Sequence, residues 1–180
     1  MTGVASGIGA ATAAQLRREG CRVIGVDLLG ADIVADLAGD EGRLHMVGEA
    51  ARRCDGALDI VVACAGVLNR GATTLAVNYF GAVATLLGLR HLLAASDAPR
   101  AVAVGSVAAY FPSNADLVAR LLAGDEAEAL GSIGNEPEIG LYAASKLALA
   151  RWCRSAAIDT DWAGAGILLN VVAPGLVETA

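Results

Sequence analysis

Aromatic and charged residues are scarce in this sequence, and the shortage excludes several classes of protein. Aromatic residues make up 4% and charged residues 18% of the 180 positions, whereas hydrophobic residues make up 56%. A chain of this composition is far from the profile of a disordered protein, and its length fits one domain with a substantial core. The net charge of −6 offers no basic surface to a phosphate backbone, so we expect no nucleic-acid partner.

Cysteine and histidine are also few, and their spacing excludes the common metal motifs. The four cysteines stand at positions 21, 54, 64 and 153, without the CxxC or Cys/His spacing of a zinc site. We therefore expect no metal, and we interpret the cysteines as small side chains in a reducing compartment. No basic region followed by an apolar run opens the sequence, as a signal peptide would. These features predict a cytoplasmic protein.

Positions 71–89 carry no charge and are numerous enough to cross a membrane. The stretch nevertheless contains three threonines, Asn78, Tyr79 and three glycines. Polar groups at this density are costly in lipid. We therefore predict a helix buried between a sheet and other helices, and no membrane partner.

Short apolar runs rich in β-branched residues alternate with longer Ala- and Leu-rich stretches. The runs that predict buried strands are 21–27, 58–64, 100–106 and 166–172. The stretches that predict helices are 8–19, 40–53, 75–95 and 140–158. This alternation predicts a single α/β domain over residues 1–180, a doubly wound, Rossmann-like parallel sheet with helices on both faces.

Residues 113–138 interrupt the alternation with six acidic residues and a single base, Arg120. We favour a solvated helical insertion, because runs of charge usually face water. The alternative is a flap beside a substrate pocket or a contact between subunits.

A glycine-rich segment stands directly ahead of the first predicted helix. It has the sequence TGVASGIG over residues 2–9, and its candidate cofactor-binding residues are Gly3, Ser6, Gly7, Ile8 and Gly9. Glycines between a strand and a helix let backbone N–H groups approach a pyrophosphate, and the helix N-terminus adds the positive end of its dipole. The hydroxyl of the serine can donate to a phosphate oxygen.

An acidic residue follows at the distance expected for a dinucleotide site. Asp27 ends the run 21–27, eighteen residues after Gly9. A carboxylate at the end of a strand accepts hydrogen bonds from the ribose diol of adenosine and repels a 2′-phosphate. No basic residue directly follows it, so NAD is favoured over NADP as the cofactor. Asp36 and Leu37 are then placed to reach the adenine ring.

Tyr142 and Lys146 are four residues apart in the predicted helix 140–158, so both lie on one face. A cation beside a phenol stabilises the phenolate and lowers the tyrosine pKa from about 10 toward neutrality, which suits a general acid/base. Ser106 closes a predicted strand, where its hydroxyl could hold a carbonyl oxygen. Asn78 lies in an uncharged helix and needs a partner, either a water or a backbone carbonyl that leads to Lys146.

Together these motifs resemble those of the short-chain dehydrogenase/reductase family. The matched positions, in the order of the family, are TGxxxGIG at 2–9, Asp27, Asn78, Ser106, Tyr142 with Lys146, and Pro174 with Gly175. The segment at 77–82 and the 36-residue interval from Ser106 to Tyr142 are similar to the bacterial 3α-hydroxysteroid dehydrogenase/carbonyl reductases. The resemblance spans nearly the whole chain. It implies an NAD-dependent oxidoreductase that interconverts a secondary alcohol and a ketone by hydride transfer.

The resemblance also implies a role for each matched side chain. Tyr142 would exchange a proton with the substrate oxygen, and Lys146 would bind the nicotinamide ribose. Ser106 would orient the substrate, and Asn78 would hold a water of the proton relay. The other implied cofactor contacts are Cys64, Ala65, Gly66, Pro174, Gly175, Val177 and Thr179. Most members have two asparagines where Ala63 and Cys64 stand, so a side-chain bond is lost while the backbone turn is expected to persist.

The family pattern further predicts that elements are missing at both ends of the chain. A single residue precedes Thr2, so an apolar strand from the middle of the sheet would be absent and its two neighbours would have unpaired backbone groups. The substrate-covering segment and the last helix and strand would follow Ala180. We therefore expect a fragment that folds poorly and is inactive, from a parent enzyme that forms homo-oligomers.

Two other functions stay open at this point. A non-catalytic NAD-binding fragment would keep the glycine-rich segment without turning over a substrate. A nucleotide-sugar epimerase or dehydratase also uses the YxxxK motif, but its glycine spacing differs from the one found here. For the oxidoreductase we expect a small-molecule alcohol or ketone as the partner, with a hydroxysteroid as one candidate.

Overall fold

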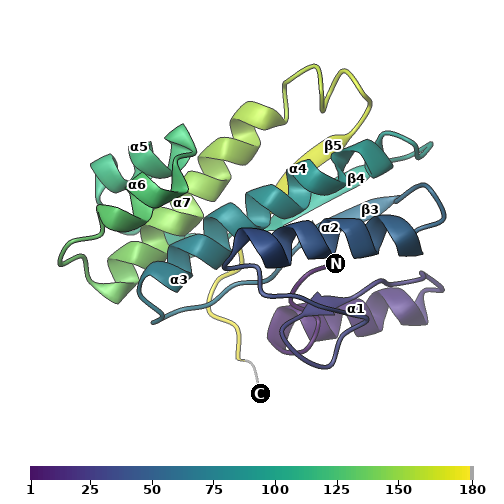
Figure 1. Cartoon of the computed structure of the whole chain (residues 1–180), viewed down its shortest axis with the longest axis horizontal. Helices are drawn as coiled ribbons and strands as arrows, with labels where there is room; N and C mark the ends of the chain where they lie inside the picture. Colours follow the sequence, from purple (N-terminus) through teal and green to yellow (C-terminus); the bar gives the residue numbers. More distant parts are fainter. Residues whose placement is uncertain (179–180) are drawn as a thin grey trace.

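The framework of the protein is a parallel β-sheet with helical connections, seen in a computed structural model that describes residues 1–178 (Figure 1). Strands β3 (Ile60–Ala63), β4 (Arg100–Val104) and β5 (Leu168–Val172) are paired in the order β3-β4-β5, all parallel. Parallel neighbours require crossover connections, and helices provide them here. The doubly wound α/β architecture predicted from the sequence is confirmed.

A second, smaller sheet lies beside the first. It consists of β1 (Val26–Asp27) and β2 (Ile33–Val34), again parallel. Thr2 connects the two sheets: it forms an isolated bridge with Val26, and its N–H donates to the Val62 carbonyl at 3.0 Å. The carboxyl ends of β1 and β3 therefore meet at the N-terminal segment.

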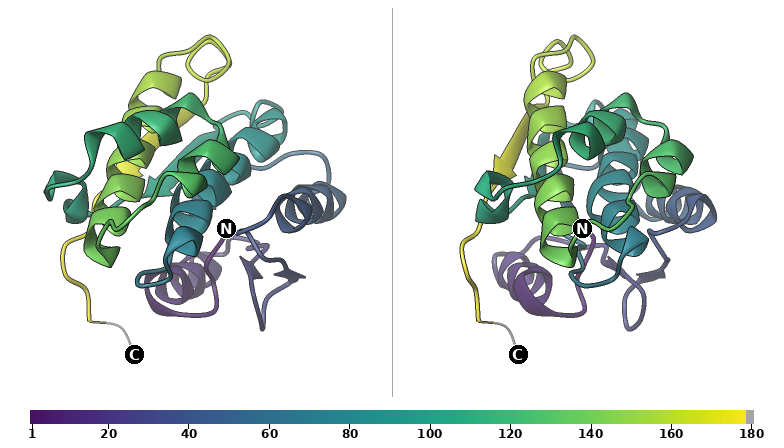
Figure 2. Two further views of the ribbon diagram at one scale, coloured as in Figure 1. Left: turned by 60° about the vertical axis from the view of Figure 1, so that its left-hand side comes forward. Right: turned by 90° about the vertical axis from the view of Figure 1, so that its left-hand side faces the viewer.

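Helices flank the sheets on two sides. Helix α1 (Gly7–Arg18) and helix α2 (Asp40–Arg53) lie on opposite sides of the N-terminal segment (Figure 2). Helix α4 (Ala82–Leu93) packs against β3 and β4, and helix α7 (Glu138–Ala156) packs against β5. The apolar core lies between these helices and the sheet.

The uncharged stretch forms one continuous helical run over Ala72–Leu93. It comprises α3 (Ala72–Leu75), the π-helix η1 (Ala76–Gly81) and α4, and by length and composition alone it could cross a membrane. However, 67% of the apolar 18-residue stretch within this run is buried inside the protein, as predicted for a core helix. Its buried polar side chains, Thr74, Asn78 and Thr85, all have hydrogen-bond partners within the protein; the Thr85 hydroxyl, for example, donates to the Gly81 carbonyl at 2.7 Å.

The acidic segment 113–138 is largely helical. After the 3-10 helix η2 (Val107–Tyr110) come α5 (Ala115–Ala123) and α6 (Glu126–Gly131). The buried apolar side chains of these helices are Leu117, Val118, Leu121 and Ala129, whereas Leu122 is exposed, and α5 packs against α7. Each helix begins with a capping side chain, Asn114 and Asp125, which accept backbone N–H groups of the first turn.

Several predicted boundaries are wrong. The predicted strand 21–27 is paired as a strand only at β1, because its partner β2 pairs only with Val26 and Asp27. Residues 21–24, which precede β1, and the start of β3 line a second cavity, of about 410 Å³. The predicted helix 75–95 begins three residues earlier and contains a π-helical segment, which the sequence period does not reveal. Strand β2 and the two helices of the acidic segment were not predicted individually.

Candidate active site

A cavity of about 570 Å³ opens at the carboxyl ends of β1, β3 and β4 and beside the start of α1. The predicted residues that line it are Gly3, Ser6, Gly7, Ile8, Gly9, Asp27, Asp36, Leu37, Cys64, Ala65, Gly66, Ser106, Tyr142, Lys146, Pro174, Gly175 and Val177. Asn78 is buried behind the cavity wall, and Thr179 lies outside the described residues. The fold thus collects residues from distant parts of the chain at one edge of the sheets, where open α/β proteins bind ligands.

The glycine-rich segment requires glycine at two of its positions. Gly3 has φ +74°, and a Cβ there would lie 2.8 Å from the Ala65 nitrogen. A Cβ on Gly9 would lie 1.7 Å from the Gly3 carbonyl oxygen, so any larger residue would push the turn apart. This close approach explains the glycine spacing and leaves backbone exposed to the cavity.

Asp27 supports the glycine-rich segment as well as facing the cavity. Its Oδ2 accepts the Ala5 N–H at 2.9 Å, and its Oδ1 accepts the Leu28 N–H at 2.7 Å. Each carboxylate oxygen can accept more than one hydrogen bond, so both remain competent to receive a ribose diol. Asp27 can therefore stabilise the turn and bind a ribose at the same time.

The turn after β3 is fixed by Thr2. The Thr2 hydroxyl oxygen accepts the N–H groups of Cys64 and Ala65 at 3.0 and 3.1 Å. The turn reaches the cavity with Ala65 and Gly66, as expected despite the missing asparagines. Burial raises the pKa of the half-buried Cys64 thiol above its usual value, which agrees with a packing role.

Lys146 is an almost fully buried cation at the cavity wall, with 3% of its surface exposed. Its Nζ donates to the Val104 carbonyl at 2.9 Å, and desolvation by burial lowers its pKa to about 8. The cation lies 5.7 Å from the centroid of the Tyr142 ring, so the two side chains share one face of α7 as predicted. Ser106 lies in the same cavity, and its hydroxyl oxygen accepts the Ala108 N–H at 3.1 Å.

Asn78 is fully buried in the π-helix, and its amide is already occupied. Its Oδ1 accepts the Val67 N–H at 2.7 Å, and its Nδ2 donates to the Val67 carbonyl at 2.9 Å and to the Ser145 hydroxyl at 3.3 Å. The expected partner was a water or a carbonyl that leads to Lys146; the carbonyl found is that of Val67, whereas Lys146 donates to the Val104 carbonyl. The Asn78 side chain fixes the segment after Gly66, where an added Cβ would lie 3.3 Å from Asn78 Oδ1 and 3.4 Å from Lys146 Nζ. π-Helical turns are frequent at functional sites.

Sequence reasoning missed part of the wall and one buried cation behind it. The additional lining residues are Val26, Leu28, Ala35, Val67, Leu68, Val77, Val104 and Gly105. Most of them directly adjoin predicted residues, so proximity in sequence was the available signal. Arg43 is 6% exposed and shares the buried face of α2 with Met46 and Ala50. Arg43 lies three and seven residues before Met46 and Ala50, so the helical period alone puts its charge on the apolar face of α2. A charge on such a face indicates a buried, paired cation, and this signal was present in the sequence.

The residues present fit a dinucleotide. The first backbone N–H groups of α1 have no acceptor within the helix, and no acidic residue occupies its first turn to repel a phosphate. The N-cap side chain of Ser6 makes no capping hydrogen bond among the described residues, which leaves its hydroxyl available. Gly3 and Gly9 open the backbone where a Cβ would fill the space. The pyrophosphate would bind here, and the adenosine ribose at Asp27.

Comparisons with known proteins agree with this geometry. Residues 1–179 match the model of the NAD dependent epimerase/dehydratase family. The chain is 36% identical to a 3-alpha-hydroxysteroid dehydrogenase/carbonyl reductase of Comamonas testosteroni, and 30% identical to a cis-4-hydroxycyclohexanecarboxylate dehydrogenase of Sinomonas cyclohexanicum. Each alignment covers 99% of this chain and 72% of the relative.

A solved structure gives the same result for fold and cofactor. The 3-alpha-hydroxysteroid dehydrogenase from Pseudomonas sp. B-0831, complexed with NADH, superposes with a TM-score of 0.93 and 47% sequence identity. The match covers 99% of this chain and 72% of that one. NAD is the cofactor of this group, as the strand-end carboxylate predicted. The chain therefore belongs to the NAD dependent epimerase/dehydratase family and, with these relatives, to the short-chain dehydrogenase/reductases, and it is an NAD-dependent oxidoreductase.

Proposed function

We propose that the protein interconverts a secondary alcohol and a ketone, with Tyr142 as the general acid/base. The observation that carries this proposal is the shared cavity: Tyr142, Lys146 and Ser106 line the same space as the glycine-rich segment and Asp27. Bound NAD supplies the acceptor for the hydride that leaves the alcohol carbon. The protein's own contribution is to orient the substrate and to move the hydroxyl proton.

Each of the three side chains has a distinct task in this proposal. The Tyr142 hydroxyl takes the proton of the substrate hydroxyl during oxidation and returns it during reduction. The Ser106 hydroxyl, at the end of β4, holds the substrate oxygen in place. The Val104 carbonyl accepts one N–H of Lys146, and the remaining N–H donors would bind the nicotinamide ribose.

Asn78 supports this arrangement from behind the wall. Its bonds to Val67 and Ser145 connect the segment after Gly66 to α7, which carries the tyrosine and the lysine. We propose that a water of the proton relay binds beside it. Pro174, Gly175 and Val177 also line the cavity, and we propose that they and Thr179 hold the carboxamide of the nicotinamide.

A hydroxysteroid or a related cyclic alcohol is the proposed substrate, because the names of two relatives specify such compounds. We propose that the enzyme works in the cytoplasm and forms homo-oligomers.

The decisive experiment replaces Tyr142 by phenylalanine. With NAD and a 3α-hydroxysteroid, we expect turnover to fall about a thousandfold, because the variant keeps the ring but loses the transferable proton. The dissociation constant of NADH, measured by fluorescence, should stay within twofold of the value for the unsubstituted protein, a difference of at most about 0.4 kcal/mol.

Two outcomes would contradict the proposal. Undiminished turnover by the Tyr142→Phe variant would exclude the phenol as acid/base. The second outcome is that the unsubstituted protein binds NADH without ever releasing NADH from NAD and an alcohol. That result would favour a non-catalytic binding protein or an epimerase, since an epimerase returns the hydride to its substrate.

A further inference from the structure

The segment 36–38 forms one wall of the cofactor cavity and is packed with little free space. Leu37 lines the cavity and is buried. A Cβ on Gly42 of α2 would lie 1.9 Å from the Asp36 carbonyl oxygen, and one on Gly81 would lie 3.0 Å from the Leu37 carbonyl oxygen. This wall is therefore held between α2 and the end of the π-helix, and its position depends on both.

Arg43 connects these elements by hydrogen bonds. Its Nε donates to the Leu37 carbonyl at 2.8 Å, and its Nη2 donates to the carbonyls of Ala38 and Ala76 at 3.1 and 3.0 Å. The guanidinium also lies 6.0 Å from the centroid of the Phe80 ring. One buried cation thus binds the cavity wall and the π-helix at the same time.

A buried guanidinium needs a counter-charge, and the acidic segment supplies it. Glu126, 83 residues farther along the chain, accepts from Nη1 and Nη2 of Arg43 at 2.5 and 2.8 Å. The second acid beside Arg43 is Asp40, whose side chain is 88% exposed and makes a single contact at 3.2 Å. Solvent screens such a contact, so Glu126 is the main partner. Its bidentate geometry fixes the plane of the guanidinium as well as its charge.

We propose that Arg43 is a positioning residue for the adenosine half of NAD and that Glu126 holds it in place from the acidic segment 113–138. This inference deepens the proposed function and depends on it for the cofactor. Removing the Glu126 charge would release Arg43 toward water and loosen the 36–38 wall. The nicotinamide end of the cavity, built on α7 and β4, would keep its shape.

The test measures cofactor affinity with two probes, NADH and ADP-ribose, which lacks the nicotinamide. In the Glu126→Gln variant we expect both dissociation constants to rise by the same factor, about fivefold. The emission maximum of bound NADH at saturation should equal that of the parent, because it reports the surroundings of the nicotinamide. Arg43→Lys, which cannot bind two carboxylate oxygens and three carbonyls in one plane, should weaken both probes further.

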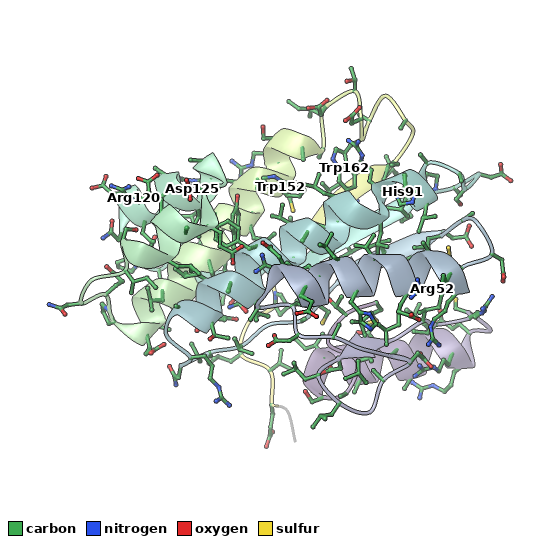
Figure 3. The ribbon with its side chains drawn as sticks, in the orientation of Figure 1. Arg52, His91, Arg120, Asp125, Trp152 and Trp162 are labelled. Carbon is green, nitrogen blue, oxygen red and sulfur yellow. The ribbon has the colours of Figure 1, made fainter. Side chains whose placement is uncertain are left out.

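The matched control is Glu128→Gln. Glu128 lies two residues away on the same helix, but its partner is Arg120, an exposed residue on the outer end of α5 (Figure 3). This variant removes the same charge from the same segment and should bind NADH like the parent.

The other possible results contradict either the proposed function or the role of Arg43 and Glu126. A parent chain that does not bind NADH would overturn the proposed function itself. Parent-like NADH binding by Glu126→Gln would overturn only the present inference. A Glu126→Gln variant that loses affinity and also shifts the emission maximum of bound NADH would overturn it too. The Arg43–Glu126 pair would then stabilise the whole cavity and not the adenosine half alone. If Arg43→Lys does not fold, Glu126→Gln carries the test, since it keeps the arginine and Asp40.

Discussion

At the scale of single residues, the site is a set of polar groups whose surroundings fix what they can do. Lys146 is the clearest case, because it is buried, bonded to one carbonyl and close to Tyr142. Its lowered pKa follows from the loss of water around the ammonium group, which the motif YxxxK alone does not reveal. The sequence predicted which side chains meet here, but not how deeply each would be buried.

Lys146 should make the stability of the fold depend on pH. Its pKa is about 8 in the folded protein, against a usual value of 10.5. Between these values the unfolded chain binds the proton and the folded chain does not, so stability rises with pH across this range. The contribution amounts to about 3 kcal/mol between pH 8 and 10.5.

Denaturant titrations of the parent and of Lys146→Met measure this effect. The difference in unfolding free energy between the two should grow in favour of the parent as pH rises from 8 to 10.5. Cys153 and Tyr79, whose pKa values burial raises to about 12, act in the opposite direction, but they are present in both proteins and cancel. A difference that stays constant with pH would contradict the prediction.

At the scale of elements, the best-predicted feature is a helix with its own boundary signals, and the worst is a strand that lacks a partner. Helix α2 has the bounds expected from the sequence, with two acids in its first turn and two arginines in its last. The run 21–27 has strand-like residues throughout, yet only β1 is paired, since pairing depends on residues elsewhere in the chain.

The turn into α1 gives a prediction at this scale. In Gly9→Ala, the new methyl group would meet the Gly3 carbonyl oxygen at 1.7 Å, so the turn must shift. We expect stability to fall by about 1–3 kcal/mol and NADH affinity to fall at least tenfold, because the shift moves the N–H groups that face the pyrophosphate.

Gly48→Ala is the control for this change. Gly48 lies within α2, where a Cβ would meet only the far end of Arg52, at 3.9 Å. Alanine is the better helix former by about 1 kcal/mol, so this variant should be more stable than the parent and should bind NADH normally. Equal effects of the two substitutions in a thermal unfolding and binding comparison would contradict the argument.

At the scale of the whole molecule, the site joins parts that are far apart in the chain, and this is where prediction from sequence was weakest. The residues of the cavity were predicted because their motifs are local. The pair of Arg43 and Glu126 was not, because a contact over 83 residues leaves no local pattern. The expectation that this chain folds poorly stays a prediction that unfolding measurements can test.

Limited proteolysis should reveal how the cofactor stabilises the assembled parts. Arg18, the last residue of α1, and Arg22, in the segment between α1 and β1, are both exposed. Residues 19–25 lie outside the paired strands, so trypsin should cut there first after a local opening. In the proposed complex NADH would bind residues on both sides of this segment, at the glycine-rich segment and at Asp27. At a concentration a hundred times its dissociation constant it should slow cleavage about a hundredfold. Cleavage at an unchanged rate would show that the opening does not involve the cofactor site.

The connection between the two sheets through Thr2 has a practical consequence. Three hydrogen bonds of Thr2, made by its N–H and its hydroxyl, join the N-terminal segment to β3 and the turn after it, and backbone bonds of Met1 and Gly3 join the segment to Val26 of β1. A dinucleotide that reaches from Asp27 to Lys146 spans the same junction over a greater length. Dialysis that strips the nucleotide should therefore shorten the shelf life of the purified protein, and nucleotide kept in the storage buffer should restore it.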